Sequence, residues 1–273
     1  MKARIRYYQQ FDADLDREVP AEAYGSWQTE LMEFDTRRMA LIVVHANDPG
    51  DSADVPGWFR AVEYLPRSVA IMEERFDELL STCRSSNLPI IHLAGTNGFH
   101  KNYPGYAAAE SLPPSTPSIT APVSTNEEIE KFRRFRRSRV FPGERNETDI
   151  RRGRGAIADF PDWSRPRGDE FVIDRADRLD AAARHLGASH LVYCGFAVNW
   201  CMWFVSGGMV DMSRLGYLCS TIEEATTAVE NAESARREEH KAYALWTISI
   251  EFGFVFPIRE FLSGVLNESN SDR

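Results

Sequence analysis

The sequence predicts an α/β protein built around a parallel β-sheet. Short, continuous aliphatic runs alternate along the chain with longer segments whose apolar residues recur at helical spacing. Continuous apolar runs of roughly four to eight residues are typical of strands buried on both faces. Because parallel neighbours need a crossover connection, usually a helix, this alternation predicts parallel strands joined by right-handed crossovers.

The first strand–helix–strand unit is predicted within residues 39–95. The run MALIVVHAND indicates a buried strand, and a loop rich in Pro, Gly and Asp follows at 49–57. The segment RSVAIMEERFDELLSTCRSSN, residues 67–87, carries apolar residues at helical intervals and predicts a helix. The run LPIIHLAG, residues 88–95, predicts the second strand.

Regular alternation returns after residue 168. Strands are predicted from DEFVID, HLVYCGF and YLCSTIEEA, at 169–174, 190–196 and 217–225. Helices are predicted at 175–187, 199–216 and 235–253, the first two ending at glycines that favour a helix C-terminus. A short strand or turn and a helical start are predicted at 254–262.

Two segments do not follow this pattern. Residues 1–38 are polar and aromatic without a clear period, and we interpret them as an arm lying on the domain. Residues 95–168 are rich in Pro, Gly, Ser and Arg and predict long functional loops, an insertion or lid. Within them TNEEIEKFRRFRRSRV has a capping pattern and predicts a helix. The chain is thus predicted to be an N-terminal arm, 1–38, and one domain, 39–273.

The overall composition is typical of one compact domain. The 273 residues are 43% hydrophobic and 27% charged. A net charge of −9 argues against nucleic-acid binding. No apolar run has the roughly 18 residues of a membrane span, and the start of the chain has no apolar run for a signal peptide. The four cysteines match no zinc or disulfide spacing. We therefore expect a cytoplasmic protein without membrane or nucleic-acid partners.

The run LVYCGFAVNWCM contains the strongest candidate for chemistry, Cys201. A glycine lies just past the strand, and Cys201 lies in the first turn of the next predicted helix. Active sites of open parallel sheets lie beyond the carboxyl ends of the strands. Exposed N–H groups at a helix N-terminus favour a thiolate and can stabilise an oxyanion, so we expect a lowered pKa for Cys201. The alternative is that Cys201 is a small buried apolar residue.

Four segments in order resemble the isochorismatase-like superfamily, which includes nicotinamidases and carbamoylsarcosine amidases. They are GFAVNWC, GGMVDMSRLGY, EEATTAVE and ALWTISIEFGFVFPIREFL, and the resemblance spans about residues 39–262. It implies a three-layer α/β/α sandwich with a central parallel sheet of about six strands. It also implies a homo-oligomer, a cis peptide bond between Phe196 and Ala197, and an oxyanion hole formed by the N–H groups of Ala197 and Cys201. The implied reaction is attack of the Cys on an amide carbonyl, assisted by an Asp and a Lys.

Two of the three positions that the resemblance implies for the Cys, Asp and Lys carry a different residue type here. His45 stands where the resemblance places the Asp, and Arg175 stands where it places the Lys. A histidine can take the thiol proton and return it to a leaving group. An arginine cannot act as a base, but it can pair with an anionic substrate. The alternative is a degenerate site in which His45 fills space and Arg175 is surface charge. The expected pocket residues are Phe196, Asn199, Trp200 and Trp58.

The sequence predicts no metal and no cofactor. His92 and His100 do not reproduce the metal-ligand spacing of related enzymes, and His92 is interpreted as structural. The run KFRRFRRSR is interpreted as a solvated helix face paired with neighbouring glutamates. The expected function is a cysteine amidohydrolase acting on a small amide or related carbonyl substrate. The alternative is a catalytically degenerate relative that binds a small molecule or a partner.

Overall fold

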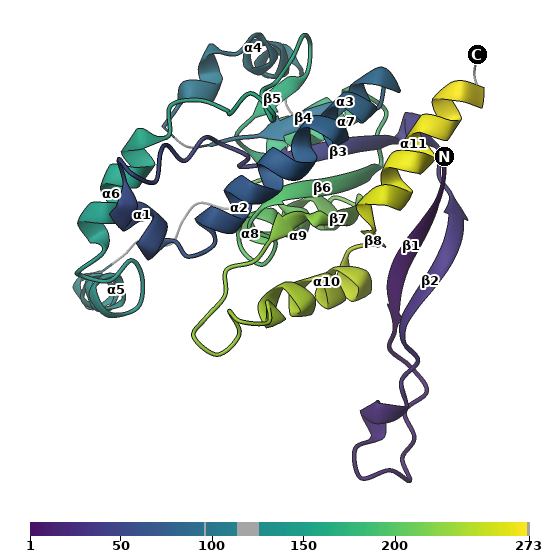
Figure 1. Cartoon of the computed structure of the whole chain (residues 1–273), viewed down its shortest axis with the longest axis horizontal. Helices are drawn as coiled ribbons and strands as arrows, with labels where there is room; N and C mark the ends of the chain where they lie inside the picture. Colours follow the sequence, from purple (N-terminus) through teal and green to yellow (C-terminus); the bar gives the residue numbers. More distant parts are fainter. Residues whose placement is uncertain (96, 114–125, 272–273) are drawn as a thin grey trace.

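The computed structural model describes residues 1–95, 97–113 and 126–271, and its centre is an eight-stranded β-sheet. Six strands are parallel and lie in the spatial order β8, β7, β6, β3, β4, β5 (Figure 1). Their bounds are Val255–Phe256, Leu218–Thr227, His190–Phe196, Met39–Val44, Ile90–Leu93 and Phe171–Ile173. The predicted parallel sheet of about six strands is confirmed.

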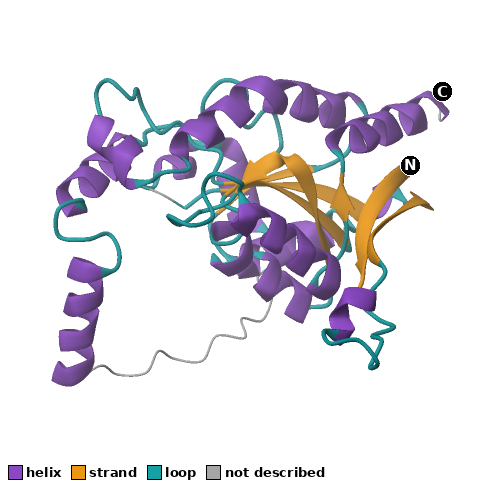
Figure 2. Cartoon of the chain, turned by 60° about the horizontal axis from the view of Figure 1, so that its bottom comes forward, coloured by secondary structure: helices purple, strands orange, loops and turns teal. Residues whose placement is uncertain are grey.

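Helices cover both faces of this sheet, which gives three layers (Figure 2). Every residue of β3 is buried, and its residues alternate between two apolar cores. One core holds Leu41 and packs under α2, η3, α3 and α11; the other holds Ile42 and packs under α7, α8, α9 and α10. The continuous apolar run of the sequence follows from this burial on both sides.

The helices of the first face are α2, η3 and α3, which run on without a break, and α11. Their bounds are Leu65–Ile71, Met72–Phe76, Asp77–Ser85 and Ile258–Ser271, and η3 is a π-helical turn. The second face carries α7, α8, α9 and α10, with bounds Ala176–His185, Cys201–Phe204, Met209–Arg214 and Glu239–Glu251. None of the helices described in the structure combines the length and apolar character needed to cross a bilayer.

The single helix predicted over 199–216 is wrong, because the structure divides it into α8 and α9. Gly207 has φ +90°, a backbone conformation that is left-handed and incompatible with a continuing helix. The N–H of Gly207 donates to the Asp211 carboxylate, which ties the break to the first turn of α9. The result is a helix of only four residues after β6.

The first 38 residues extend the sheet instead of lying on the domain as an arm. Strands β1, Lys2–Gln9, and β2, Ser26–Glu33, form an antiparallel hairpin, and β1 also pairs antiparallel with β8. Ala3 and Ile5 are buried, whereas Lys2 and Arg4 are exposed. The alternation of buried and exposed residues is short and the hairpin tip is polar, so the sequence does not indicate strands here. Short 3-10 turns, η1 at Pro20–Ala23 and η2 at Thr36–Arg38, complete this region.

The 95–168 segment contains more helix than the sequence predicts. The helix α5, Glu127–Arg139, is confirmed, and its cap is Asn126, whose side chain accepts from the Ile129 N–H at 3.0 Å. Residues 114–124 of the predicted loops and Thr125 of the predicted helix lie outside the described residues. The unpredicted elements are η4, Phe99–Asn102, α4, Pro104–Ser111, and α6, Glu147–Ala156. A further short helix, α1, Pro56–Ala61, begins within the last two residues of the loop predicted at 49–57.

Candidate functional site

The strands β3 and β6 are parallel neighbours at the centre of the sheet, and later strands are added outward from each of them in opposite directions. From β3 the chain adds β4 and β5 on one side, and from β6 it adds β7 and β8 on the other. Their crossovers leave on opposite faces, which opens a crevice beyond the carboxyl ends of the two strands. His45 follows β3 directly, and the segment leading to Cys201 follows β6.

The two strand ends approach each other closely because Gly195 has no side chain. Gly195 has φ +111°, and a Cβ at this position would stand 2.0 Å from the Val44 carbonyl oxygen. The next peptide bond, Phe196–Ala197, is cis, as the resemblance implies. The Ala197 carbonyl then accepts the N–H groups of Trp200 and Met202, each at 3.1 Å. This turn places Cys201 at the start of α8.

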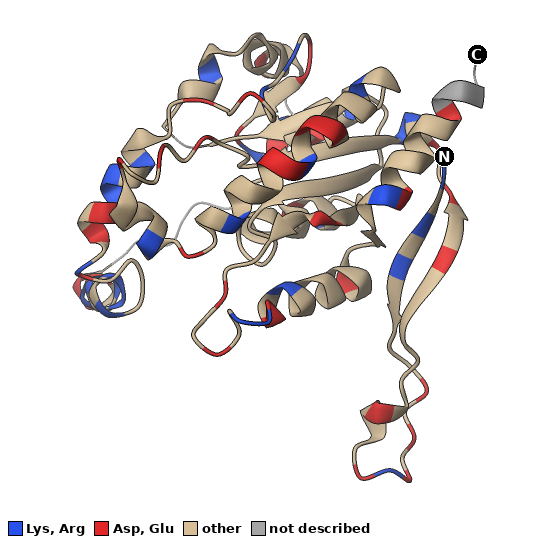
Figure 3. Cartoon of the chain, in the orientation of Figure 1, with Lys and Arg blue, Asp and Glu red and all other residues tan. Residues whose placement is uncertain are grey.

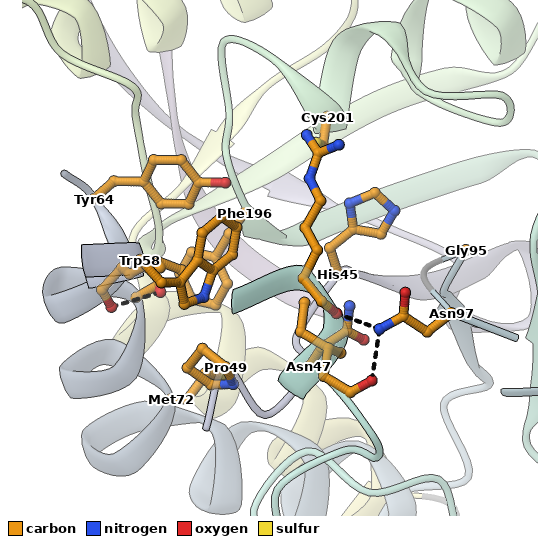
Figure 4. Close-up of a pocket in the computed structure, with 14 residues that line it drawn as sticks. His45, Asn47, Pro49, Trp58, Tyr64, Met72, Gly95, Asn97, Phe196 and Cys201 are labelled. Atoms are coloured by element: carbon orange, nitrogen blue, oxygen red, sulfur yellow. Dashed lines mark hydrogen bonds between the residues drawn. The ribbon is translucent and has the colours of Figure 1, made fainter. Parts of the chain in front are cut away.

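Cys201 lines a pocket of about 420 Å³ at this crevice. The walls come from the ends of β3 and β6, from α1, α2 and η3, and from the 95–168 segment (Figure 4). The lining residues are His45, Asn47, Pro49, Trp58, Tyr64, Leu65, Ser68, Met72, Gly95, Asn97, Arg154, Ile157, Phe196 and Cys201. Of the predicted site residues, the structure therefore brings together Cys201, His45, Phe196 and Trp58.

The expected lowered pKa of Cys201 is wrong. Burial raises the pKa of the thiol, while a hydrogen bond from the Ala197 backbone and the charge of Arg154 lower it by less. The helix α8 has only four residues, so its dipole is weak compared with that of a full helix. The free protein therefore holds Cys201 as a thiol at neutral pH.

His45 is held in a left-handed backbone conformation, with φ +47°, at the end of β3. Its N–H donates to the Leu93 carbonyl at 3.0 Å. Burial lowers the pKa of the ring to about 4, so the imidazole is neutral at physiological pH. No hydrogen bond joins His45 to Cys201 in the described part of the chain, although both line the pocket.

Tyr64 and Arg154 are site residues that sequence reasoning missed. The electrostatic influence of Cys201 contributes to the raised pKa of Tyr64, and its hydroxyl points toward Cys201 in Figure 4. Of the described residues that line the pocket, Arg154 alone carries a full charge at neutral pH, since His45 is neutral. The pocket is therefore electropositive and suited to an anionic group.

Arg154 is positioned by packing of α6 on the pocket wall. A Cβ at Gly153 would stand 2.0 Å from Trp58 Cγ, so the glycine permits close contact between α6 and α1. The Asn97 side chain donates to the carbonyls of Arg154 and Ile157, the latter at 2.9 Å. Part of the 95–168 segment is thus a wall of the pocket.

Two buried polar atoms of the pocket have no hydrogen-bond partner in the described structure, Asn47 Oδ1 and Trp58 Nε1. Asn47 is 8% exposed and Trp58 is 7% exposed. Unpaired buried polar atoms cost free energy, which is recovered when a ligand or water pairs with them. Both atoms lie within the pocket wall and expose almost no surface, so Arg154, which is exposed, is the charged group that a ligand can reach.

Four predicted site residues lie outside the pocket lining, and one of them, Ala197, is fully buried in the turn after β6. Arg175 forms ion pairs with Glu110, Asp174 and Asp177 at 2.7, 3.0 and 3.0 Å, which hold α7 against α4. Asn199 exchanges hydrogen bonds with the Val229 backbone at 2.8 and 2.9 Å. Trp200 is 42% exposed and packs edge-to-face on Phe141. Each has a structural role where it stands.

The two histidines considered as metal ligands are paired with carboxylates away from the pocket. His92 Nε2 lies 2.9 Å from Glu170, and His100 Nε2 lies 3.1 Å from Asp174. Among the described residues, no group of three or more His, Cys, Asp or Glu side chains is arranged to hold a metal ion.

The fold is similar to that of a cysteine hydrolase from Pseudomonas syringae pv. phaseolicola, at 13% identity and a TM-score of 0.51, covering 86% of this chain and 95% of that chain. An isochorismatase from Pseudomonas putida matches at 16% identity, TM-score 0.46 and coverages of 84% and 93%. N-carbamoylsarcosine amidase from Thermoplasma acidophilum matches at 16% identity, TM-score 0.40 and coverages of 82% and 98%. No family model and no curated protein matches the sequence. The resemblance to isochorismatase-like cysteine hydrolases is confirmed at the level of the fold.

Proposed function

We propose that the chain is a divergent isochorismatase-like cysteine hydrolase that acts on a small amide or related carbonyl compound through Cys201. One observation carries the proposal: Cys201 and a neutral His45 line the same pocket at the central crevice of the sheet. A thiol and an unprotonated imidazole facing one substrate volume are the two groups that a Cys–His hydrolase requires.

In the proposed reaction, attack and deprotonation are coupled, because Cys201 is a thiol in the free protein. His45 takes the thiol proton as the sulfur bonds to the carbonyl carbon. The N–H groups of Ala197 and Cys201 stabilise the oxyanion. Collapse of this intermediate breaks the C–N bond, and His45 returns the proton to the leaving amine. Water then cleaves the thioester and restores the thiol, releasing a carboxylic acid.

The charge of the pocket supports a substrate that also carries a carboxylate or another anionic group. Arg154 lines the pocket and forms no ion pair with any described carboxylate. Trp58 and Phe196 provide apolar walls beside it. We therefore propose small amides with an anionic group, held by a charge-assisted hydrogen bond to Arg154.

To test this, we would measure hydrolysis rates for a panel of small amides with and without a carboxylate. Mass spectrometry of the protein during turnover would detect any covalent adduct. We expect an acyl adduct on Cys201, and no adduct or turnover in Cys201→Ala. Arg154→Leu should raise KM for the anionic amides by about tenfold to a hundredfold and leave neutral amides unaffected. Arg152→Leu, an exposed position on the same helix, is the matched control. Equal turnover by wild type and Cys201→Ala would refute the mechanism.

The raised pKa of Cys201 and the lack of a hydrogen bond to His45 favour a second candidate, a small-molecule-binding protein without turnover. Calorimetry separates the two functions. The binding protein would hold carboxylate ligands equally well after Cys201→Ala, lose them after Arg154→Leu, and show no adduct with any member of the panel.

A further inference from the structure

Two elements project from opposite ends of the molecule and carry opposite charge. The first is the tip of the β1–β2 hairpin, residues 10–25, and the second is the helix α5 (Figures 1 and 2). The acidic tip contains five carboxylates, at positions 12, 14, 16, 18 and 22, and one arginine, Arg17. From Lys131 to Arg139, α5 contains six basic residues and no acidic one. Figure 3 shows the two groups of charge well separated.

Both elements also expose apolar side chains to solvent. In the acidic tip, Phe11, Leu15 and Val19 are 54%, 85% and 49% exposed. In α5, Phe132 and Phe135 are 54% and 62% exposed. Apolar residues gathered on a projecting element are typical of an interaction surface.

The helix α5 gains no stability from a buried face. None of its residues is buried. An isolated helix of 13 residues is marginal in water, since most helix stability in proteins comes from packing of an apolar face. Its Asn126 cap and the Glu130–Arg133 ion pair at 2.6 Å contribute only modestly. The helix therefore has an apolar and basic surface that a partner can cover.

We propose that the partner is a second copy of this chain, whose acidic tip docks on α5. Phe11 and Leu15 of one copy would pack on Phe132 and Phe135 of the other, surrounded by the opposite charges. The two elements lie at opposite ends of the molecule in Figures 1 and 2, so they cannot meet within one chain. A two-fold dimer makes the contact twice, once with each tip, and buries both surfaces.

A copy of this chain fits α5 better than a polyanion does. The net charge of −9 opposes nucleic acid, an anionic membrane and a second copy alike, but the second copy presents its carboxylates beside the exposed apolar residues Phe11 and Leu15, which can pack on α5. The same charge distribution steers an acidic tip toward α5, and complementary charge patches set the orientation of a protein partner. Dimerisation is expected to weaken as salt screens these charges.

The experiment is sedimentation velocity of the full chain over a range of concentrations at low salt. The tip variant carries Asp12→Lys, Asp16→Lys and Glu18→Lys, and the helix variant carries Arg134→Glu, Arg136→Glu and Arg137→Glu. All six residues are exposed. The wild type should be a dimer, and each variant alone should dissociate at least about a hundredfold more readily. Circular dichroism verifies that both variants remain folded.

An equimolar mixture of the two variants should restore the dimer. In the mixed dimer the positive tip meets the negative helix and the negative tip meets the positive helix, so both contacts are complementary again. A control with Glu73→Lys, Asp77→Lys and Glu78→Lys, exposed on η3 and α3, makes the same change in net charge as the tip variant and should leave the dimer intact. This test does not depend on the hydrolase proposal.

Three outcomes would overturn the proposal. The wild type could remain a monomer at every concentration, the two variants could dimerise as strongly as the wild type, or their mixture could stay dissociated. A monomeric wild type that binds an oligonucleotide or anionic vesicles through α5, with loss of binding in the helix variant, would assign α5 to a polyanion instead.

Discussion

His190 is expected to make the folded protein sensitive to mild acid. Its ring is 7% exposed and lies between the rings of Phe34 and Phe256, at centroid distances of 5.6 and 6.1 Å. Its Nε2 is 2.7 Å from Ser220 Oγ. Burial lowers the pKa of His190 from 6.5 to about 4, because the charged imidazolium is poorly solvated in this position.

The sign of the effect follows from the difference between the folded and unfolded pKa values. As pH falls below 6.5, the unfolded chain binds a proton at His190 that the folded chain does not bind, so stability is lost. The loss continues until the pH reaches the folded pKa of about 4. Between about pH 7 and about pH 5, proton linkage at this one ring removes about 2 kcal/mol from the free energy of unfolding.

The assay is urea unfolding of the wild type and His190→Gln at several pH values in that window. The glutamine keeps a polar group near Ser220 but does not titrate. We expect the variant to lose about 2 kcal/mol less than the wild type between about pH 7 and about pH 5, whatever its stability at neutral pH. Parallel pH profiles for the two proteins would show that His190 is protonated as readily in the folded chain as in the unfolded one, and would refute the reasoning.

Two further predictions concern the strand end before Cys201 and the thiol itself. Alkylation of Cys201 by iodoacetamide should be slow at neutral pH, and its rate should still rise beyond pH 9.0, the usual thiol pKa, because burial raises the pKa of this thiol. Peptide mass spectrometry with Cys201→Ala as the control identifies the alkylated residue. An alkylation rate that reaches its plateau below about pH 8 would contradict the raised pKa. Gly195→Ala should destabilise the fold by about 2 to 4 kcal/mol in urea unfolding, because its Cβ would stand 2.0 Å from the Val44 carbonyl oxygen. Gly168→Ala has positive φ but open space and should cost only about 1 kcal/mol, so equal losses in the two variants would exclude the steric clash as the cause.

The central strands could be predicted from the sequence because burial on both faces leaves a local signal. The aliphatic run of β3 supplies both apolar cores at once, so hydrophobicity alone identifies it. The placement of Cys201 was predictable for a similar reason, since a strand, a glycine and a cysteine follow one another in sequence. The β1–β2 hairpin gave no such signal, because only Ala3 and Ile5 mark its buried side.

The electrostatics of the site could not be predicted from the same local pattern. The pKa of Cys201 depends on how deeply the pocket walls bury the sulfur and on where α8 ends, and both are tertiary properties. Arg154 reaches the pocket only because Gly153 lets α6 pack on Trp58, a contact between distant parts of the sequence. The position of Arg175 outside the pocket lining has a local cause, since Asp174 and Asp177, which form ion pairs with it, are its neighbours in the sequence.

The hairpin at the N-terminus has a consequence for how the sheet ends. β8 has only two residues, and β1 covers its outer side, so the strand at this edge of the sheet is β2. An outer strand offers unpaired backbone groups to other chains and is a common starting point for aggregation. β2 exposes Glu30 and Glu33 along with Leu31. Where two identical β2 strands approach edge to edge with these glutamates facing each other, the repulsion between the carboxylates disfavours pairing of two chains through this edge.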